Sequence, residues 1–265
     1  MYWQKRFDRE HPDNKLEGII IEIRKNNKDF GYRRIYGELK KRGINVNKKK
    51  VQRIVQKLGL QVTSFTRKSR KYSSYKGNIG RIAPNRIHRR FNTSVPHQKI
   101  TTDTTEFKYY DVDEKGRMSI QKLYLDPFMD MFNSEILSYG IDKHPSAQNV
   151  MNALNEAIKI TSACPYRRTF HSDRGWAYQM KVYSNTLKSN RIYQSMSRKG
   201  NCYDNSIMEN FFGIMKQEMY YGCVYYSYEE LKNAIENYIN YYNKQRIKQK
   251  LSWMSPVEYR LSQVA

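Results

Sequence analysis

The segment RTFHSDRG, residues 168–175, decides the fold, because a short run of strand-forming residues ends there in the acidic side chain Asp173. A second acid, Asp103, lies inside the strand pattern of residues 100–109, where an aspartate is disfavoured unless something compensates for its burial. A third acid, Glu209, lies one turn into a helical pattern otherwise lined by aromatic residues and methionine. If the two strands are neighbours and the helix packs against them, the three carboxylates converge.

The patterns on either side of these acids predict a mixed sheet flanked by helices. The expected elements, in chain order, are strands at 100–109, 119–125 and 135–141, a helix from Ser146 or Gln148, a strand at 168–173, a helix through Tyr183 and Leu187, a strand at 191–196, a helix from Ser206 through Met219 and a helix at 227–245. The first three strands form an antiparallel meander. We therefore predict an α/β (α+β) core over residues 99–221, with a C-terminal helical extension over 222–265.

Residues 1–62 carry three short helical patterns. Apolar residues recur at helical spacing and glycines close the second and third helices: Leu16, Ile19, Ile20, Ile23, Ile35, Leu39, Gly43, Val51, Ile54, Val55, Leu58 and Gly59. Three helices with a tight turn before a basic last helix, which Asn47 can cap, predict a helix-turn-helix DNA-binding domain. The residues off the apolar stripe that could face a groove are Lys48, Lys49, Gln52, Arg53 and Gln56, of which the first four are the candidate DNA contacts. A small helical bundle with a solvated basic face is the alternative.

The chain of 265 residues is strongly basic, with 48 Lys+Arg against 25 Asp+Glu and a formal charge of +23. Residues 1–98 hold 26 Lys+Arg and 7 Asp+Glu, whereas residues 99–265 hold 22 and 18, so the excess is N-terminal. No acid lies between Glu38 and Asp103. Such a stretch repels itself unless a polyanion neutralises it, which predicts salt-sensitive binding to DNA phosphates.

Residues 63–98 interleave the basic side chains with Ser, Thr, Tyr and Gly. This composition is typical of an extended linker on nucleic acid, whereas a membrane-surface binder has an amphipathic basic helix with an exposed apolar face. The residues expected to contact DNA phosphates are Arg67, Lys68, Arg70 and Lys71. A merely solvated basic segment is the alternative.

Composition excludes several classes of protein. With 39% apolar residues and 14% aromatics the chain can bury a core, which excludes wholesale disorder. No apolar run of about 18 residues and no secretory signal occur, so we expect a soluble, cytoplasmic protein with no membrane partner. Cys164, Cys202 and Cys223 form no C-x-x-C pair, and the five histidines form no pair at zinc-ligand spacing. A disulfide framework and a structural zinc site are therefore not supported.

Three converging carboxylates would repel one another. Like charges at close range raise one another's pKa, and divalent cations remove the problem. A small set of oxygen ligands favours Mg²⁺ or Mn²⁺, with water and substrate phosphates completing the coordination. Two such ions roughly 4 Å apart can activate an attacking oxygen and stabilise the leaving oxygen of an in-line displacement at phosphorus. For each acid alone, a solvated or salt-bridged carboxylate is the alternative.

The spacing and the flanking residues of the acids resemble a known family. Thirty-five residues separate Asp173 from Glu209, as in the D,D-35-E pattern of retroviral-integrase-type catalytic cores. The strings HSDRG (171–175) and SMSRKGNCYDNSIMENFF (195–212) closely resemble the second-frame transposases of the IS-three group of bacterial insertion sequences. FGYRRI (30–35) resembles the family's helix-turn-helix entry. Further matches are Tyr242, Asn243, Arg246, Leu251 and Pro256, so the likeness covers residues 15 to 260.

The resemblance implies an RNase H-like core of the DDE type, in which Asp103, Asp173 and Glu209 are the catalytic residues and the metal ligands. It implies hydrolysis or strand transfer at insertion-sequence ends, dependent on two Mg²⁺ (or Mn²⁺) ions and without a covalent intermediate. The implied partners are double-stranded DNA, as element ends and target, and further copies of the chain in a homo-oligomer on that DNA. The implied location is the bacterial nucleoid.

Three departures from the family pattern stand out. Ile100, Thr101 and Thr102 precede the first Asp where the family commonly has Trp, a packing change that leaves Asp103 assigned. Lys248 stands where the family usually has His. The family's complete transposase usually joins an upstream frame with its own helix-turn-helix and a coiled coil, so we expect an incomplete transposase or a differently organised relative.

Residues near the acids have candidate roles in binding DNA. Lys216, two helical turns after Glu209, can hold a substrate phosphate or be solvated. Asn205 can orient Glu209 or the DNA, or cap the helix. His171 and Arg174 can contact phosphate or support the site from outside, or be structural.

Two other acids are weaker candidates. Asp204 is a rival third ligand, ranked below Glu209 because a loop places a ligand less rigidly than a helix does. Asp130 is expected in the turn after the second strand, where it only terminates that strand.

Two other functions are open to a basic chain of this kind. A tyrosine recombinase needs one activated Tyr within a cluster of Arg and His, and the Tyr-rich stretch 220–228 contains neither, so core and base-stacking roles fit it better. A DNA-binding regulator with a catalytically dead core is the other reading. The three intact acids argue against it.

Overall fold

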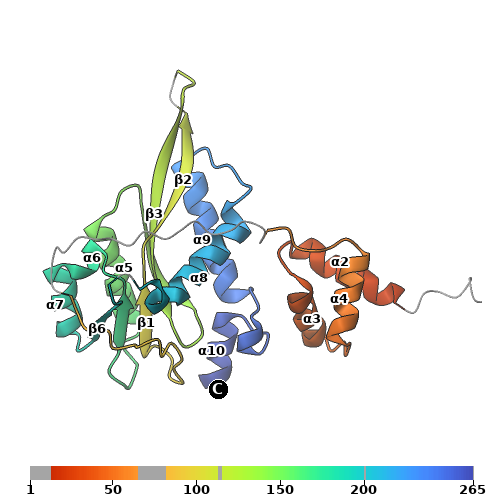
Figure 1. The fold of residues 1–265 in the computed structure, drawn as a ribbon, viewed down its shortest axis with the longest axis horizontal. Helices are drawn as coiled ribbons and strands as arrows, with labels where there is room; N and C mark the ends of the chain where they lie inside the picture. Colours follow the sequence, from red (N-terminus) through yellow and green to blue (C-terminus); the bar gives the residue numbers. More distant parts are fainter. Residues whose placement is uncertain (1–12, 65–81, 113–114, 200, 265) are drawn as a thin grey trace, which may run out of the picture. The chain divides into compact units, whose positions relative to one another are not determined.

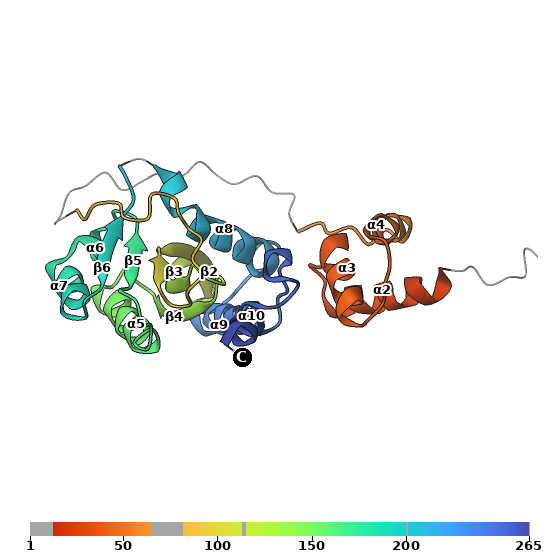
Figure 2. The same ribbon diagram turned by 90° about the horizontal axis from the view of Figure 1, so that it is seen from below.

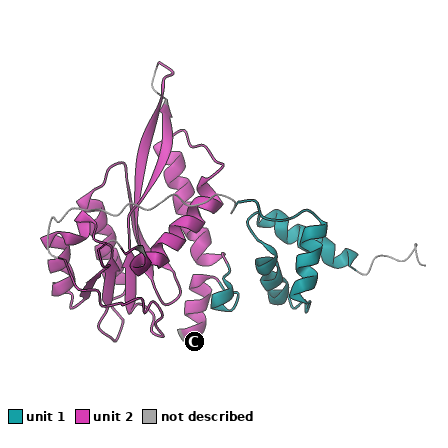
Figure 3. Cartoon of the chain, in the orientation of Figure 1, with its two compact units in different colours: residues 1–67, 247–254 teal, residues 68–246, 255–265 magenta. Residues whose placement is uncertain are grey.

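The computed structural model describes residues 13–64, 82–112, 115–199 and 201–264. The chain divides into two compact units (Figure 3). The first comprises Met1–Arg67 with Ile247–Met254, and the second comprises Lys68–Arg246 with Ser255–Ala265. Each unit has a hydrophobic core of its own.

The first unit is built on three short helices, α2 Asn14–Asn26, α3 Tyr32–Lys41 and α4 Lys48–Lys57 (Figure 1). Their apolar stripes meet in one core, formed by Ile20, Ile23, Phe30, Ile35, Leu39, Val51, Ile54 and Val55, with Ile247 from the late segment of the unit. The three helices predicted from hydrophobic periodicity are thus confirmed.

Local signals set where these helices begin and end. The Asn47 side chain accepts a hydrogen bond from the Lys49 N–H and caps α4, as predicted. Gly43 and Gly59 follow α3 and α4 with φ of +74° and +66°, a left-handed conformation that glycine adopts without steric cost.

The second unit contains a six-stranded mixed sheet. Its strands are β1 Lys99–Thr102, β2 Thr105–Val112, β3 Met118–Asp130, β4 Ile136–Asp142, β5 Thr169–Ser172 and β6 Tyr193–Met196. β3 pairs antiparallel with β4 along one edge and with β1 and β2, end to end, along the other. β1 also pairs parallel with β5, and β5 pairs parallel with β6.

The first strand is interrupted, which the sequence did not predict. Residues 100–109 were expected to form one strand, yet β1 ends before Asp103 and β2 begins after Thr104. β1 and β2 keep one register against β3, and Asp103 falls opposite Pro127, which has no N–H to donate to a ladder bond. The Thr104 N–H instead bonds to the Asp103 carboxylate at 2.8 Å.

Helices cover both faces of the sheet. They are α5 Ala147–Ile160, α6 Trp176–Gln179, α7 Lys181–Ser189, α8 Ser206–Met215, α9 Tyr228–Lys244 and α10 Pro256–Val264. Leu123, Leu125 and Met129 of β3 pack with α8 and α9, whereas Phe128 packs with α5, α6 and α7. Figure 2 shows α8 and α5 on opposite sides of the strands. The predicted mixed sheet flanked by helices is confirmed. Within the described residues, no helix is long and apolar enough to cross a membrane.

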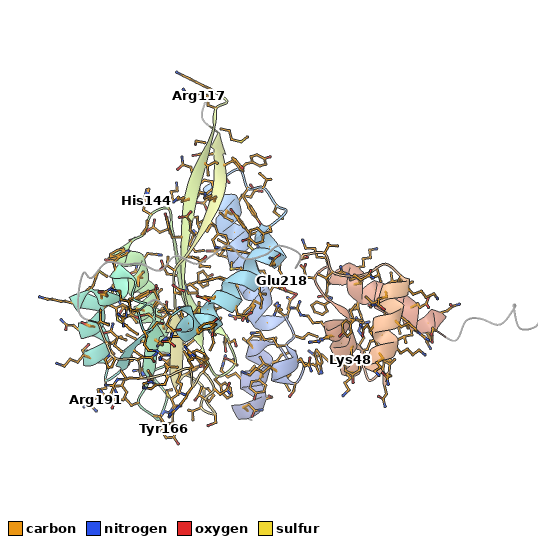
Figure 4. The ribbon with its side chains drawn as sticks, viewed as in Figure 1. Lys48, Arg117, His144, Tyr166, Arg191 and Glu218 are labelled. Carbon is orange, nitrogen blue, oxygen red and sulfur yellow. The ribbon has the colours of Figure 1, made fainter. Side chains whose placement is uncertain are left out.

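The helix α8 is shorter than predicted. It ends at Met215, and the chain continues as a π-helical turn, Lys216–Tyr220. Within this turn Glu218 (labelled in Figure 4) is buried, and Arg246 donates to both of its carboxylate oxygens at 2.8 Å. The Tyr238 hydroxyl donates to the same carboxylate at 2.9 Å. The wider turn thus accompanies a buried ion pair between residues far apart in the sequence.

Asp130 ends β3 but is fully buried, instead of lying in a turn. Its carboxylate accepts hydrogen bonds from the N–H groups of His97 at 2.7 Å and Phe132 at 3.0 Å. Burial raises the pKa of Asp130 to about 6, and these hydrogen bonds oppose the shift only in part. The residue ties the segment before β1 to the end of β3.

Arg246→Ala is expected to destabilise the second unit by about 3–5 kcal/mol, because the Glu218 carboxylate is left buried without its counter-charge. The double variant Glu218→Gln/Arg246→Met removes both charges and is expected to lose less stability than Arg246→Ala alone. Urea unfolding of the three proteins measures both effects. A double variant less stable than Arg246→Ala would contradict this account of the pair.

Candidate active site

The sheet brings two of the predicted acids level with each other. β1 and β5 are parallel neighbours with Thr101 opposite His171. Asp103 and Asp173 lie two residues after this pair, just past the ends of their strands. The carboxyl ends of adjacent parallel strands are where such sheets gather functional side chains.

Glu209 comes from a different element. It lies in the first turn of α8, a helix that packs against β1. Its negative charge raises the pKa of Asp103, although less than the charge of Asp173 does. The three acids therefore share one electrostatic environment. Among the described residues, however, no group of three or more His, Cys, Asp or Glu is arranged to hold a metal ion.

Burial sets the electrostatics of the three acids. Burial first, and the charge of Asp173 second, raise the pKa of Asp103 well above its ordinary value. Burial also raises the pKa of Asp173, opposed by the Gly175 N–H, which donates to Oδ1 at 2.7 Å. The pKa of Glu209 is raised by burial as well. Two neighbouring carboxylates in this environment resist ionising together, and a divalent cation between them would reverse that preference.

Asp103 is held from two sides. The Thr104 N–H donates to Oδ1, and the Asn205 side-chain amide donates to Oδ2 at 3.0 Å. The Asn205 carbonyl oxygen accepts from the Thr101 hydroxyl at 3.0 Å. Asn205 is only 4% exposed and makes no side-chain cap on α8. It therefore orients Asp103, where the sequence suggested Glu209, the DNA or a helix cap.

Asp204, ranked below Glu209 as a third ligand from the sequence, is already paired with cationic side chains. It is 1% exposed, and its carboxylate accepts hydrogen bonds from Arg198, Arg89 and Asn85. The hydrogen bond from the Arg198 side chain is the largest cause that holds the pKa of Asp204 well below its usual range. A carboxylate whose two oxygens are bound by guanidinium groups has no need of a metal.

His171 and Arg174 flank Asp173 but differ in what they can reach. His171 is fully buried, with Nδ1 2.8 Å from the Ser195 hydroxyl and Nε2 2.9 Å from the Asp204 carbonyl oxygen. Burial lowers the pKa of His171 to about 4. With no exposed surface and a partner at each ring nitrogen, His171 has a structural role. Arg174 is half-buried and donates from Nε to the Ser197 carbonyl at 2.8 Å.

Lys216 lies within electrostatic reach of the acids. Its ammonium stands over the Phe107 ring, 5.0 Å from the ring centroid. Burial lowers the pKa of Lys216, and the negative charges of Glu106 and Asp103 oppose the shift. A half-buried cation at the edge of an acidic site can bind a substrate phosphate.

The basic residues predicted to bind DNA divide into two groups. On α4, Lys48 (Figure 4) and Lys49 are exposed, Gln52 is half-buried, and Arg53 forms an ion pair with Asp13 at 3.0 Å. The four linker residues lie outside the described residues: Arg67, Lys68, Arg70 and Lys71.

One buried acid beside the site escaped sequence reasoning. Asp126 of β3 is 2% exposed and accepts hydrogen bonds from the Thr104 hydroxyl at 2.6 Å and the Asn149 amide at 3.0 Å. Its charge adds to those that raise the pKa of Asp103. An acid followed by Pro127 within an otherwise apolar strand was the signal that could have drawn attention to it.

Family models match most of the chain. Two models described as "Integrase core domain" match residues 94–202 and 209–263. A third, described as "HTH-like domain", matches residues 11–69. The matches thus cover the sheet, the helices that flank it and the three N-terminal helices.

Curated relatives are similar over most of their own length. An "Uncharacterized transposase-like protein" of Haemophilus influenzae is 45% identical over 82% of this chain and 94% of that protein. The "Putative transposase InsK for insertion sequence element IS150" of Escherichia coli K12 is 42% identical over 91% of this chain and 81% of that protein. "Transposase InsF for insertion sequence IS3A", also of E. coli K12, is 28% identical over 97% of this chain and 84% of that protein.

Two solved structures with low sequence identity are similar to part of this chain. The HTLV-2 integrase catalytic core domain in complex with magnesium is 18% identical, with a TM-score of 0.46 over 63% of this chain and 97% of that one. The catalytic domain of Mos1 mariner transposase is 14% identical, with a TM-score of 0.41 over 54% of this chain and 70% of that one.

Asp173→Asn is expected to lower the pKa of Asp103, because the variant removes the neighbouring charge that contributes most to raising it after burial. Carboxyl ¹³C NMR titration in chelator-treated buffer measures the shift. Asp111→Asn, an exposed change on β2, is the matched control and should leave the pKa of Asp103 unchanged. An Asp103 pKa that is the same in Asp173→Asn and the parent protein would contradict the pairing of the two acids.

Proposed function

The chain belongs to the IS-three group of insertion-sequence transposases, and we propose that it cleaves DNA at the ends of an insertion sequence and joins those ends to target DNA. It is accordingly a DNA transposase, a polynucleotidyl transferase with an integrase core. The family resemblance seen in the sequence strings around Asp173 and Glu209 is confirmed.

The observation that carries the proposed chemistry is the pair of half-buried aspartates at the ends of β1 and β5. Asp103 and Asp173 stand level on adjacent parallel strands, and each has a raised pKa. Glu209 adds a third carboxylate from α8. Such a site favours a bound cation over two unpaired negative charges.

We propose that Asp103, Asp173 and Glu209 together hold two Mg²⁺ or Mn²⁺ ions. The donor set fits these metals, because all three side chains offer hard carboxylate oxygens and too few of them to complete a Ca²⁺ site. When bound, the ions would activate the attacking oxygen and stabilise the leaving oxygen. The repulsion between Asp103 and Asp173 supports the assignment, since a cation would relieve it.

The remaining residues have supporting roles in this proposal. Asn205 and the Thr104 N–H orient the Asp103 carboxylate, and the Gly175 N–H orients that of Asp173. Lys216 and Arg174 would bind the phosphates next to the cleaved bond. A water oxygen in cleavage, or a 3′-hydroxyl in joining, forms a new bond to phosphorus as the bond to the leaving oxygen breaks. No protein–DNA covalent bond forms.

Double-stranded DNA is the proposed partner of the basic residues. The helix-turn-helix unit would present Lys48, Lys49 and Gln52 of α4 to a groove, with Arg53 shared between Asp13 and phosphate. Of the predicted linker 63–98, the part before residue 82 would follow the DNA backbone, whereas residues 82–90 contact β6 and the loop before α8. The core at 99–221 is extended by the helices of 222–246 and 255–265, and residues 247–254 group with the first unit. Because an insertion sequence has two ends, we propose a homo-oligomer on DNA, acting at the bacterial nucleoid.

Asp173→Asn and Glu209→Gln are each expected to reduce cleavage of element-end DNA by on the order of 10³-fold or more, because residues that act as a unit fail together. Gel assays with labelled end DNA and Mg²⁺ measure the 3′-end products and the joined products. Glu229→Gln, an exposed acid in the first turn of α9, is the matched control and should retain full activity. Metal-independent cleavage, or full activity in both site variants, would remove the mechanism.

Replacing Arg67, Lys68, Arg70 and Lys71 together by Ala is expected to weaken DNA binding and to flatten its dependence on salt, because fewer counterions are released. The matched control removes four exposed lysines from core helices: Lys159, Lys181, Lys188 and Lys244. Binding measured by anisotropy between about 50 and 200 mM salt gives the slope for each protein. An unchanged slope in the linker variant would exclude these residues as phosphate contacts.

A further inference from the structure

The last part of the acid-free basic stretch lies against the core. We term residues 82–90 the anchor segment. Its Arg86 N–H donates to the Ser195 hydroxyl of β6 at 2.9 Å, and its Ala83 N–H lies 3.4 Å from the Met196 sulfur. Ile87 is 2% exposed. Figure 2 shows this segment in gold beside the loop that precedes α8.

The anchor segment is fastened to the core at one buried carboxylate. Asp204 accepts hydrogen bonds from Arg89 Nε at 3.1 Å and from the Asn85 amide at 3.0 Å. Arg198 donates to the same carboxylate from its backbone N–H, from Nε and from Nη2, at 2.9–3.0 Å. Charge-assisted hydrogen bonds of this kind are the stronger ones in proteins.

The backbone of the anchor segment is constrained at the same place. His88 and Arg89 have φ of +49° and +61°, a left-handed conformation that costs energy in residues other than glycine. Such a conformation persists only where the surroundings hold it. Asn85 accepts from the His88 N–H at 2.9 Å, and Arg89 Nη2 donates to the Asn201 side chain at 3.1 Å.

Asp204 connects this anchorage to the catalytic acids. The next residue, Asn205, donates to Asp103 and accepts from Thr101. His171 adds a second connection, because its ring bridges the Asp204 carbonyl and the Ser195 hydroxyl that binds the anchor segment. Asp204 and Asn205 also lead directly into the first turn of α8, which carries Glu209.

We propose that Arg89 and Asp204 are positioning residues, which hold Asn205 against Asp103 and so make the geometry of the active site depend on the docked anchor segment. This inference rests on the proposed function. It predicts that the basic stretch acts on the rate of the chemical step as well as on DNA affinity. The competing role for Arg89 is a direct contact with a DNA phosphate.

Arg89→Ala separates these two roles. Because it removes a charge-assisted hydrogen bond to Asp204, it is expected to slow single-turnover cleavage at saturating DNA at least about tenfold, with little change in DNA affinity. Arg90→Ala, its neighbour, removes the same charge from an exposed side chain and should change neither quantity by more than about twofold. Arg89→Lys keeps the charge but not the planar guanidinium, and should fall between the two.

A double-mutant cycle tests whether Arg89 acts through Asn205. If it does, Arg89→Ala should slow cleavage no further in an Asn205→Ala background. Hydrogen exchange supplies a readout apart from catalysis: Arg89→Ala should speed exchange of the Arg198 N–H, which donates to Asp204, while Arg90→Ala should not. Thermal unfolding of each variant tests whether the fold is retained.

The outcomes are distinct. Equal rates for Arg89→Ala and Arg90→Ala, or losses from Arg89→Ala and Asn205→Ala that multiply, would overturn the inference. A loss confined to DNA affinity and to its salt dependence would assign Arg89 to phosphate binding instead. If the parent protein cleaves no DNA with any divalent metal, the proposed function fails. The exchange of the Arg198 N–H then still decides whether Arg89 holds the loop at Asp204.

Discussion

The repulsion between Asp103 and Asp173 is the constraint on which the rest of the second unit depends. Each carboxylate is half-buried and has a pKa raised chiefly by burial, and the charge of Asp173 raises the pKa of Asp103 further. The parallel pairing of β1 and β5 puts them level, because the two strands end at the same edge of the sheet. That pairing in turn requires the long connection through β2, β3, β4 and α5 before the chain returns as β5.

The groups that touch these acids orient them without neutralising them. Asp103 receives a backbone N–H and a side-chain amide, and Asp173 receives a backbone N–H. All three donors are uncharged. The guanidinium groups of Arg89 and Arg198 are bound to Asp204, one residue before the amide that contacts Asp103, and Arg174, which follows Asp173, donates from Nε to the Ser197 carbonyl. Among the described hydrogen bonds to the two carboxylates, none comes from a charged donor.

Local signals made much of the fold predictable from the sequence. Asn47 caps α4 as expected, and Ser146 and Ser227, at the predicted starts of two further helices, also accept backbone N–H groups. Most predicted strands and helices lie within a few residues of their observed positions. The failures came from contacts between distant residues. Pro127 interrupts the strand at Asp103 from across the sheet, and a π turn accompanies the pairing of Glu218 with Arg246. Neither effect can be read from the local propensity of the residues that it changes.

The candidate site was likewise predictable from local signals but not from contacts between distant residues. The two aspartates follow from strand patterns and spacing. The partners of Asp204 in the anchor segment, and those of Asn205 at the end of β1, lie more than a hundred residues earlier in the chain. Part of the N-terminal excess of positive charge contacts the core. Arg86 lies over the Tyr193 ring, 4.3 Å from its centroid, and Arg89 is bound to Asp204. Both side chains are exposed, yet Arg89 is paired with a carboxylate of the core and Arg86 with one of its aromatic rings. The acid-free basic stretch is therefore not wholly available to DNA, because Arg89 is paired with Asp204, a carboxylate more than a hundred residues later in the chain.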